Sequence, residues 1–492
     1  MASVYKNYID GEWVESQATE TIPNINPASF AHSWGEVPLS TAAEATQAID
    51  AAEKAFDEWR KVPAPKRGEI VLNAWKIMEG RVDEIARHLS REEGKIFKEA
   101  RGELMKTLNC LEYLGGEGRR LSGVSRESEL PRNYAYTRRE PLGVVGLITP
   151  WNFPVAIPAW KIAPALVAGN TIVLKPSELT PQTACDVVQC FIDAGVPKGV
   201  LNMVHGLGEV VGHTIVKDHR VSAISFTGSN EVGHLIYAEG AERGARVQCE
   251  MGGKNPIIVL ADANLPLAAE ATAQGAFGST GQRCTATSRA IVHEDVADEF
   301  VAMLTEKMKG IVAGDPLDPE TTMGPSVDRN QFERVLDYLT VGKDEATQVM
   351  GGQRMTENGL DGGYFIEPTL FDHVSPTARI AQEEIFGPVL SVIRVKSFEE
   401  AIEVANNVKY GLSSSLYTND YACVFEYIDR IETGICHVNS PTMGGEAHMP
   451  FGGMKSTGIG GREMNEEAME FFTELKTVYF DYTGAGRTSS MY

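Results

Sequence analysis

Between residues 143 and 260, short apolar runs rich in β-branched residues alternate with amphipathic stretches, and this alternation constrains the fold more than any other feature of the chain. The strand-like runs are residues 143–149, 171–175, 200–204, 221–226 and 256–260. The helix-like stretches between them are residues 158–168, 182–194, 208–217 and 230–243. Strand–helix units repeated in this way form a buried parallel sheet with helices on both faces, so we predict a doubly wound α/β nucleotide-binding domain.

A second series of the same kind follows further along the chain. Its strand-like runs are residues 289–293, 389–395, 413–417 and 435–439, and its helix-like stretches are residues 296–311, 397–409 and 420–431. Upstream of both series, apolar residues recur at helical spacing in residues 41–60, 67–90 and 93–115. We therefore predict a mainly helical N-terminal region and a second, separate α/β domain.

Two segments fit neither series. Residues 133–140 and 476–482 alternate polar and apolar side chains as strands do. They could pair with each other as a small arm or add as edges to the sheet of another subunit, and both possibilities stay open. The tail from residue 483, TGAGRTSSMY, is predicted to be a flexible end.

Charge and cysteine content exclude several classes of function. The 492-residue chain has a formal net charge of -22, which repels nucleic acid and anionic membranes. We expect no membrane span and no signal peptide, because apolar stretches of the required length are missing, and the expected compartment is therefore the cytoplasm. The seven cysteines show no CxxC pair and no zinc-like spacing, so we expect free thiols and no metal site.

Two glycine-rich turns each follow a predicted strand and open a predicted helix, where a helix N-terminus can bind phosphate. The first contains Gly206, Gly208 and Gly212, with one residue more than the GxGxxG spacing. The second contains Gly228 and Ser229. A tight turn explains the first equally well, and Ser229 could be only a helix cap.

Polar residues at two further strand ends are candidates for binding or catalysis. Lys175, Ser177 and Glu178 surround the end of the run TIVLK, where they could hold ribose hydroxyls or form a solvated charge pair. Asn152 lies in the stiff segment TPWNFP, where its amide could stabilise an oxyanion or cap its own turn.

A cysteine and a glutamate supply candidate catalytic groups. Cys284 follows Arg283 in the segment GQRC, and the charge of the arginine could favour the thiolate; the alternative is an inert buried thiol. Glu250 precedes two glycines in EMGGKNP, where a carboxylate could act as a general base, an N-cap or a surface charge.

Taken in order, the motifs TPWNFP, LKPSE, FTGS, EMGGKNP, GQRC, EEIFGPV and MPFGGMKSTGIGGRE resemble those of the aldehyde dehydrogenase superfamily, and the resemblance extends from YIDGEW to TELKTV. It implies an α/β fold of two doubly wound domains with a small β oligomerisation arm, assembled as a homodimer or homotetramer. The implied parts are an NAD(P)-binding domain at residues 1–120 and 141–252, a catalytic domain at residues 253–440, and an arm at residues 121–140 and 474–492.

The resemblance also implies a reaction, the NAD(P)-dependent oxidation of an aldehyde to a carboxylic acid. Cys284 would form a thiohemiacetal and then a thioester, with the oxyanion held by the Asn152 amide and the Cys284 backbone N–H. Glu250 would deprotonate the hydrolytic water, and Lys161 and Glu463 match positions of a proton relay. Lys161 could instead be a structural charge and Glu463 half of a surface ion pair.

The implied cofactor is NAD, with NADP possible. Glu178 would bond a free 2′-hydroxyl and repel a 2′-phosphate, a repulsion that Lys175 and Ser177 could partly offset. Glu384 would hold the nicotinamide ribose, and the family's different use of the pyrophosphate loop accounts for the off-length glycine motif. The implied cofactor residues are Thr149, Pro150, Trp151, Lys175, Ser177, Glu178, Gly208, Gly212, Phe226, Gly228, Ser229, Glu384 and Phe386.

The sequences of two segments, STGQRCTATSR and NFPVAIPAWK, most resemble those of the 2-oxoglutarate semialdehyde (2,5-dioxopentanoate) dehydrogenases. Dehydrogenases of succinate semialdehyde, aminoadipate semialdehyde or sulfolactaldehyde are alternatives, as are a CoA-dependent acylating enzyme and a catalytically silent homologue, and the loop SPTMGGEAHMP departs from the first branch. Arg283 could bind a substrate carboxylate or pair with a structural acid. The implied substrate residues are Phe153, Ile157, Trp160, Arg283, Thr285 and Phe451, with the loop 440–447.

Overall fold

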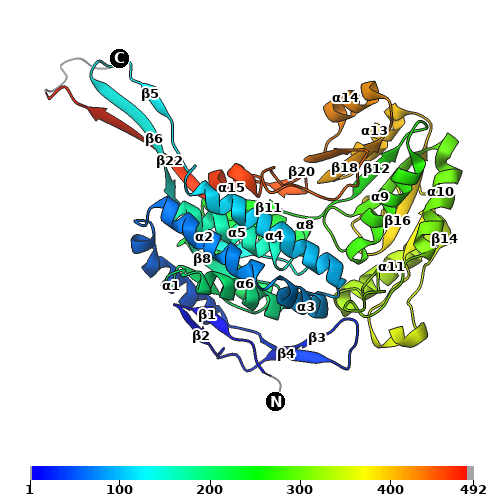
Figure 1. The fold of residues 1–492 in the computed structure, drawn as a ribbon, viewed down its shortest axis with the longest axis horizontal. Helices are drawn as coiled ribbons and strands as arrows, with labels where there is room; N and C mark the ends of the chain where they lie inside the picture. Colours follow the sequence, from blue (N-terminus) through cyan, green and yellow to red (C-terminus); the bar gives the residue numbers. More distant parts are fainter. Residues whose placement is uncertain (1–2, 485–492) are drawn as a thin grey trace.

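The computed structural model describes residues 3–484. Figure 1 shows two α/β bodies side by side, each built around one large sheet, and a narrow β arm that projects from the first body. Within residues 3–484, no helix is both long enough and apolar enough to span a membrane.

The first body contains an eight-stranded sheet in the order β2-β1-β9-β8-β7-β10-β11-β21. Its centre is parallel, as the alternation of strands and helices predicted, and short antiparallel strands add to both edges. The strands are β1 (Asn7–Ile9), β2 (Glu12–Val14), β7 (Val144–Ile148), β8 (Thr171–Lys175), β9 (Leu201–Met203), β10 (Val221–Thr227), β11 (Arg246–Glu250) and β21 (Gly458–Ile459).

Helices cover both faces of this sheet, and each face has its own apolar core. One face carries α1 (Ala42–Trp59), α7 (His213–Lys217) and α8 (Asn230–Glu242). The other carries α2 (Ala64–Glu79), α3 (Val82–Glu93), α4 (Phe97–Glu117), α5 (Ala156–Ala168), α6 (Pro181–Asp193) and α15 (Asn465–Phe471). The predicted helix at residues 67–90 is wrong in one respect, because Gly80 and Arg81 divide it into α2 and α3.

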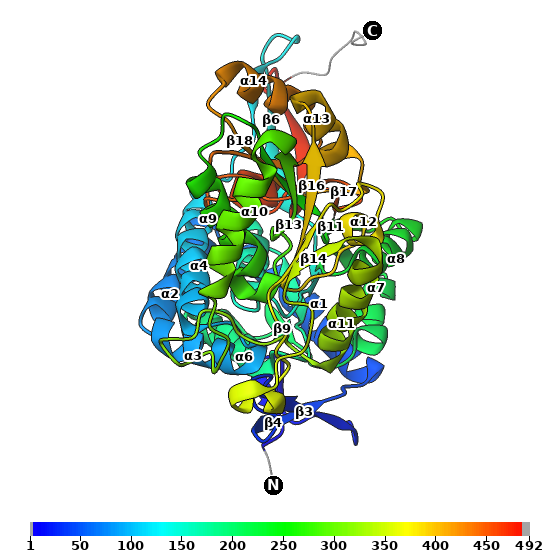
Figure 2. The same cartoon turned by 90° about the vertical axis from the view of Figure 1, so that its right-hand side faces the viewer.

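The second body contains a seven-stranded sheet in the order β14-β15-β16-β13-β12-β18-β19. Figure 2 shows α9 and α10 on one side of this sheet and α11 and α12 on the other. The strands are β12 (Asn255–Val259), β13 (Thr287–His293), β14 (Thr347–Met350), β15 (Thr369–Asp372), β16 (Val389–Val395), β18 (Ser413–Tyr417) and β19 (Ile435–Val438). The helices are α9 (Leu265–Phe277), α10 (Glu294–Lys309), α11 (Arg329–Glu345), α12 (Arg379–Gln382), α13 (Phe398–Asn406) and α14 (Tyr421–Arg430).

One predicted strand belongs to the other sheet. The run at residues 256–260 was placed in the first series, but it forms β12 at the centre of the second sheet, between β13 and β18. The first sheet is completed instead by β11, whose sequence RVQCE carries polar residues at alternate positions. A fully buried apolar run is the same in either sheet, so local pattern cannot assign it.

Smaller strand pairs complete the molecule. β3 (Thr21–Ile25) pairs with β4 (Ser33–Pro38), so the first forty residues contain strands where a mainly helical N-terminal region was expected. β17 (Tyr410–Gly411) pairs with β20 (Met454–Lys455).

The arm is a three-stranded sheet in the order β22-β6-β5. β22 (Thr473–Asp481) pairs antiparallel with β6 (Asn133–Pro141) along its whole length, and β5 (Ser125–Glu127) adds to the other edge of β6. The two segments that alternated in the sequence therefore pair with each other within one chain. The final part of the predicted flexible tail, residues 485–492, lies outside the described residues.

Candidate active site

Cys284 lies at the meeting point of two cavities. One, of about 350 Å³, has in its wall the six residues predicted to contact substrate: Phe153, Ile157, Trp160, Arg283, Thr285 and Phe451. The other, of about 240 Å³, is lined among others by Pro150, Trp151, Gly228, Ser229, Glu384 and Phe386. Cys284 and three neighbours, Ile157, Thr227 and Met251, belong to both walls. Molecules bound in the two cavities would therefore meet at the thiol. We call them the catalytic cavity and the cofactor cavity.

The backbone before Cys284 makes a tight turn. Ser279, Thr280 and Gly281 have φ values of 49°, 57° and 69°, in the left-handed region that glycine adopts most easily. A Cβ atom at Gly281 would lie 2.2 Å from the carbonyl oxygen of Gly387, so no other residue fits there without movement. The Cys284 carbonyl oxygen accepts a 2.8 Å hydrogen bond from Asn255 Nδ2, which ties the segment to β12.

Burial raises the pKa of the Cys284 thiol to about 12, and the carboxylates of Glu384, Glu250 and Glu463 add to that effect. The neighbouring guanidinium does not oppose it. Arg283 donates to Glu99 Oε1 over 3.0 Å and to a serine hydroxyl over 2.9 Å. The thiol pKa is thus shifted in the direction opposite to that expected from an adjacent arginine, because burial dominates and the guanidinium is paired with Glu99.

Glu250 ends β11 and faces the catalytic cavity together with Cys284. Its Oε2 accepts a 3.2 Å hydrogen bond from the Gly453 N–H, whereas its buried Oε1 has no partner among the described residues. Burial holds the pKa of this carboxyl well above its ordinary value, and the Glu463 carboxylate raises it further. A buried carboxyl with one free oxygen and a raised pKa has the properties of a general base.

Lys161 and Glu463 form a buried ion pair, with side chains 1% and 2% exposed. The pair is held from both sides, because Trp160 Nε1 donates to Glu463 Oε2 over 2.9 Å and Lys161 Nζ donates to the Ser225 hydroxyl over 2.6 Å. The suggestion that Glu463 belongs to a surface ion pair is therefore wrong. Its negative charge reaches the reactive groups by raising the pKa values of Glu250 and Cys284.

Asn152 is buried, and its Nδ2 donates to the backbone carbonyl oxygen of Gln282 over 3.1 Å. The backbone carbonyl oxygen of Asn152 accepts a 2.6 Å hydrogen bond from Lys95 Nζ, which also contacts Glu103 Oε2 at 2.6 Å. The other oxygen of Glu103 accepts hydrogen bonds from the N–H groups of Val155 and Ala156, at 2.9 and 3.1 Å. Lys95 and Glu103 thus clamp the segment between Asn152 and the start of α5, at a site that the sequence reasoning missed.

The signal that could have revealed the clamp is the spacing of polar residues on α4. Residues Glu99, Gly102, Glu103 and Lys106 all line the catalytic cavity, and they recur at intervals of three or four on a helix that is otherwise apolar toward the core. Only the apolar residues of this helix were considered in the sequence-based prediction, and its polar face borders the cavity.

The groups that line the cofactor cavity suit the ribose and ring at one end of a dinucleotide. The half-buried Glu384 carboxylate accepts a 3.0 Å hydrogen bond from the Gly253 N–H and can also accept one from a hydroxyl group. The rings of Trp151 and Phe386 pack edge to face, with their centroids 5.4 Å apart, and form an aromatic wall. Gly228 is needed because a Cβ atom there would lie 2.5 Å from the Phe226 ring. Gln331 and Arg334 of α11 also line this cavity and were not predicted.

The remaining predicted cofactor residues lie outside the walls of both cavities, among the residues that the structure describes. Lys175 Nζ contacts Glu178 Oε2 at 2.9 Å, but with side chains 7% and 29% exposed this pair is largely buried and not the solvated pair given as the alternative to ribose binding. The Thr149 hydroxyl is buried without a partner in residues 3–484, and Phe226 packs in the core. The others are Ser177, which is buried, Gly208, which opens an exposed turn, and Gly212, which ends it.

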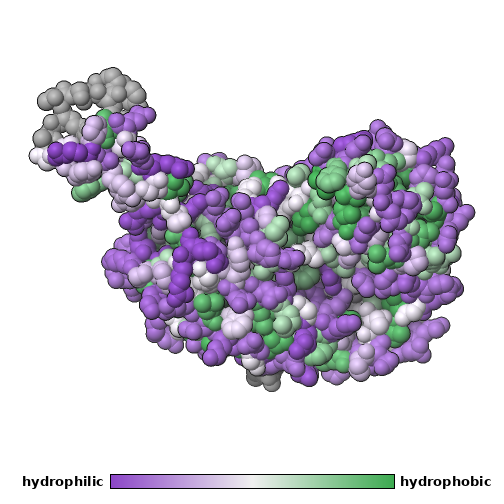
Figure 3. Space-filling model, turned by 45° about the horizontal axis from the view of Figure 1, so that its top comes forward, coloured by the Kyte–Doolittle hydropathy of each residue, from purple (hydrophilic) through white to green (hydrophobic). Residues whose placement is uncertain are grey.

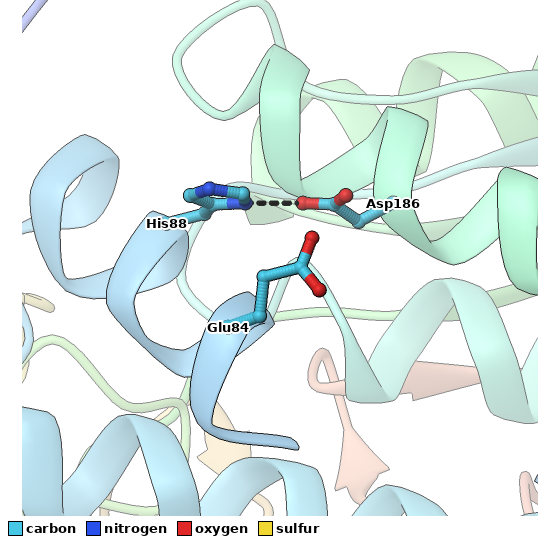
Figure 4. Close-up of side chains that lie close together, drawn as sticks. All are labelled: Glu84, His88 and Asp186. Atoms are coloured by element: carbon cyan, nitrogen blue, oxygen red, sulfur yellow. Dashed lines mark hydrogen bonds and ion pairs between the residues drawn. The ribbon is translucent and has the colours of Figure 1, made fainter. Parts of the chain in front are cut away.

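A cluster outside this site has a donor set that could hold a metal ion. The ligand atoms of Glu84, His88 and Asp186 lie within 4.8 Å of one another. Figure 4 shows His88 Nδ1 pointing at Asp186 Oδ2, at 2.7 Å. Arg81 already supplies positive charge, because it contacts Asp186 at 2.7 Å and Glu84 at 2.8 Å. We therefore interpret the cluster as an ion-pair network that joins α3 to α6.

Comparison with known proteins agrees with this geometry. The model of the aldehyde dehydrogenase family matches residues 13–478. The chain is 45% identical to the alpha-ketoglutaric semialdehyde dehydrogenase of Bacillus subtilis over 97% of this chain and 98% of that protein. It is 44% identical to the alpha-ketoglutarate semialdehyde dehydrogenase of Haloferax volcanii, over 98% of this chain and 100% of that one. The crystal structure of betaine aldehyde dehydrogenase from Staphylococcus aureus in complex with NAD+ superimposes with a TM-score of 0.95 at 34% identity, covering 98% and 96% of the two chains. The chain belongs to the aldehyde dehydrogenase family.

Proposed function

We propose that the protein oxidises 2,5-dioxopentanoate, which is α-ketoglutarate semialdehyde, to 2-oxoglutarate with NAD as the oxidant. The observation that carries this proposal is the position of Cys284 in the walls of both cavities. A thiol placed there can bind an aldehyde from one side while the hydride acceptor approaches from the other. The substrate follows from the names of the Bacillus and Haloferax relatives and from the cationic groups in the catalytic cavity.

The first step is attack by the thiol on the aldehyde carbon. The raised pKa of Cys284 means that the thiol must lose its proton as it reacts, and Glu250, whose pKa is also raised, accepts it on the free Oε1. The product is a thiohemiacetal whose oxyanion is held by Asn152 Nδ2 and the Cys284 N–H. A preorganised donor of this kind contributes roughly 3–4 kcal/mol to the transition state.

Bound NAD supplies the chemistry of hydride acceptance, which turns the thiohemiacetal into a thioester. Glu250 must first release to solvent the proton that it took from the thiol. It then takes a proton from water, the hydroxide displaces the cysteine thiolate to release the acid, and the thiolate recovers this second proton from Glu250. One aldehyde, one NAD+ and one water thus give one carboxylic acid, one NADH and a proton. The presence of a general base at Glu250 favours water over CoA as the acceptor. Glu463 serves this step by raising the pKa of the base, an effect that the positive charge of its partner Lys161 partly offsets.

The cofactor cavity would hold the nicotinamide end of the dinucleotide, and residues outside its walls would hold the adenosine end. Glu384 would bond the nicotinamide ribose, Phe386 and Trp151 would border the ring, and Gly228 with Ser229 would lie near the pyrophosphate. Lys175 and Glu178 would bond the adenosine ribose, for which their ion pair must open. NAD is favoured over NADP because Glu178 repels a 2′-phosphate, and the Staphylococcus neighbour supports it.

We further propose a homodimer or homotetramer in the cytoplasm. The arm exposes large apolar side chains that a monomer would leave in water, among them Tyr479 at 68% and Phe480 at 61% exposure. Figure 3 shows the arm standing clear of the two bodies. On α14, Tyr421 is 78% and Phe425 67% exposed, which supplies a second apolar surface. The seven free cysteines suit a reducing compartment.

A substrate panel tests the proposal. The purified protein is assayed for NADH or NADPH absorbance with 2,5-dioxopentanoate, succinate semialdehyde, aminoadipate semialdehyde, sulfolactaldehyde and pentanal. We expect the highest kcat/KM with 2,5-dioxopentanoate and NAD, 2-oxoglutarate as the product, and no turnover by Cys284→Ala although it still binds NAD. Absence of reduction with every aldehyde would refute the enzyme assignment, and products formed only with CoA would replace hydrolysis by acylation.

A further inference from the structure

The catalytic cavity has three cationic side chains in its wall, and they differ in what they contact. Lys95 is held by Glu103 at 2.6 Å, and Arg283 is held by Glu99 at 3.0 Å. Lys106, in residues 3–484, has no carboxylate partner within ion-pair distance, and its ammonium donates to the backbone carbonyl oxygen of Gly445. Lys106 is therefore the cation of this cavity that has no carboxylate in ion-pair contact, although Glu446 of the neighbouring hollow acts on its pKa from beyond that distance.

Lys106 stands at an opening of the cavity. Lys106 and Gly445 line both the catalytic cavity and an outer hollow that contains the exposed residues Asn109, Glu112 and His448. The side chain is half-buried, and burial lowers the pKa of its ammonium. A partly desolvated cation gains more from an anionic ligand than one in water does. A substrate that enters with its aldehyde toward Cys284 leaves its other end at this opening.

Arg283 is placed differently. Three of its nitrogens are already in contact with protein: Nη2 with Glu99, Nε with Ser279 Oγ at 2.9 Å and Nη1 with Met443 Sδ at 3.3 Å. Glu99, Arg283 and Met443 line both the catalytic cavity and a second, larger hollow of about 920 Å³. The arginine thus forms part of the wall between the two spaces. Binding of a substrate carboxylate would require it to share or leave Glu99.

The rest of the catalytic cavity is mostly apolar. Phe153, Ile157, Trp160, Phe451 and Met464 supply aromatic and aliphatic surface that receives the carbon chain of a substrate but not its charge. A cavity of about 350 Å³ is at the small end of small-molecule sites, which suits a short-chain acid. The carboxylate of such a substrate needs a cation at the end of the cavity, and Lys106 is the available one.

We infer that Lys106, and not Arg283, binds the carboxylate of the semialdehyde at the opening of the catalytic cavity and sets the preference for anionic aldehydes. The inference rests on the proposed function for its choice of substrate. Because α4 is a regular helix packed on α5 and α2, the lysine is presented from a rigid element. The Gly445 carbonyl oxygen is the group that the substrate carboxylate displaces from the ammonium.

The test compares charged and neutral aldehydes of equal length. Wild type, Lys106→Met, Lys106→Arg and Arg283→Met are assayed with NAD on 2,5-dioxopentanoate, 5-oxopentanoate and pentanal. The readout is the ratio of kcat/KM for each acid to that for pentanal, with kcat and KM resolved separately. Lys98→Met is the matched control, because Lys98 is an exposed lysine of the same helix that lines the outer hollow of about 920 Å³.

We expect Lys106→Met to lower both ratios about 10- to 100-fold, mainly through KM, since a hydrogen bond to a charged group is lost. Lys106→Arg should restore most of the ratio, and Lys98→Met should leave it at the wild-type value. An unchanged ratio in Lys106→Met would overturn the inference, as would a fall confined to Arg283→Met. Thermal unfolding and NAD binding of each variant establish that it is folded.

Failure of the proposed function gives a different result. If wild type prefers 5-oxopentanoate to 2,5-dioxopentanoate, the proposed substrate is wrong. A fall in Lys106→Met of the kcat/KM ratio of 5-oxopentanoate to pentanal would still support carboxylate binding by Lys106. If wild type prefers pentanal to both acids and Lys106→Met does not change either ratio, the anionic substrate class and carboxylate binding by Lys106 are both refuted.

Discussion

Replacement of Lys95 by methionine tests whether the clamp beneath Asn152 positions the reaction. The ammonium and the Glu103 carboxylate have side-chain exposures of 1% and 0%, so Lys95→Met leaves a buried carboxylate without its partner. Loss of one member of a buried pair costs about 3–5 kcal/mol. Two backbone N–H groups at the start of α5 still bond Glu103, so we expect the lower end, about 3 kcal/mol.

The assay separates stability from catalysis. About 3 kcal/mol corresponds to a fall in Tm of roughly 6–12 °C for a folding unit of 150–250 residues, measurable by differential scanning fluorimetry. Lys95 also holds the backbone carbonyl oxygen of Asn152, so its loss should let the Asn152 amide move away from the oxyanion. We therefore expect kcat to fall about 10- to 100-fold, which is less than the full effect of removing an oxyanion donor. The double variant Lys95→Met/Glu103→Gln removes both charges, so it should regain stability but not kcat.

Two results would contradict this reasoning. A loss below about 1 kcal/mol in Lys95→Met would mean that Glu103 is not left unpaired in the folded protein. Recovery of kcat together with stability in the double variant would show that the pair acts on folding alone and does not position Asn152. Lys98→Met, which removes an exposed lysine at the start of α4, the helix that carries Glu103, should change Tm by less than the equivalent of about 0.5 kcal/mol.

Three further predictions follow from single contacts. Because Glu250 accepts the thiol proton and also deprotonates the hydrolytic water, Glu250→Gln should slow both steps and lower kcat at least about 100-fold in the NADH absorbance assay; a kcat equal to that of wild type would exclude the base role. The hydrogen bond to Asp186 raises the pKa of His88, so the folded state binds the imidazole proton more tightly than the unfolded state does. The stability that this interaction contributes is therefore present below pH about 6.5 and is lost as the pH rises through the raised pKa. His88→Gln should therefore flatten the fall of Tm above pH 6.5, and an unchanged slope would contradict this. Gly228→Ala should weaken NAD binding at least about 10-fold by titration calorimetry, because its Cβ must displace the Phe226 ring; unaltered affinity would show that the ring moves freely.

Most elements could be predicted from local pattern, because apolar runs of period two and amphipathic stretches of period 3.6 are properties of short segments. The predicted strands of the first sheet at residues 143–149, 171–175, 200–204 and 221–226 correspond to β7, β8, β9 and β10. Two errors show what local pattern cannot predict: helix α11 was missed, and strand β12 was placed in the wrong sheet. Pairing of buried strands depends on the path of the chain between sheets, which a short segment does not contain.

The candidate site divides in the same way. The motif order identified Cys284, Glu250 and Asn152 as candidates, and their residue types state the chemistry that each can perform. Their partners were not identified, because Lys95, Glu103 and Lys106 lie far from the motifs in sequence and meet the cavity through the packing of α4 and the residues just before it on α5. The same packing binds Arg283 to Glu99, almost two hundred residues away in the chain.

By itself, then, the sequence determined the family, the α/β class and the identity of the candidate nucleophile, since these depend on residue type and order. Only the tertiary structure decided which charges are paired. Burial sets the direction of the pKa shifts of Cys284, Glu250 and Lys106. Pairing leaves Lys106 as the cation of the catalytic cavity without an ion-pair contact, among the residues that the structure describes. The physical reason is that electrostatic interactions depend on distance and burial, and both arise from contacts between segments that are remote in sequence.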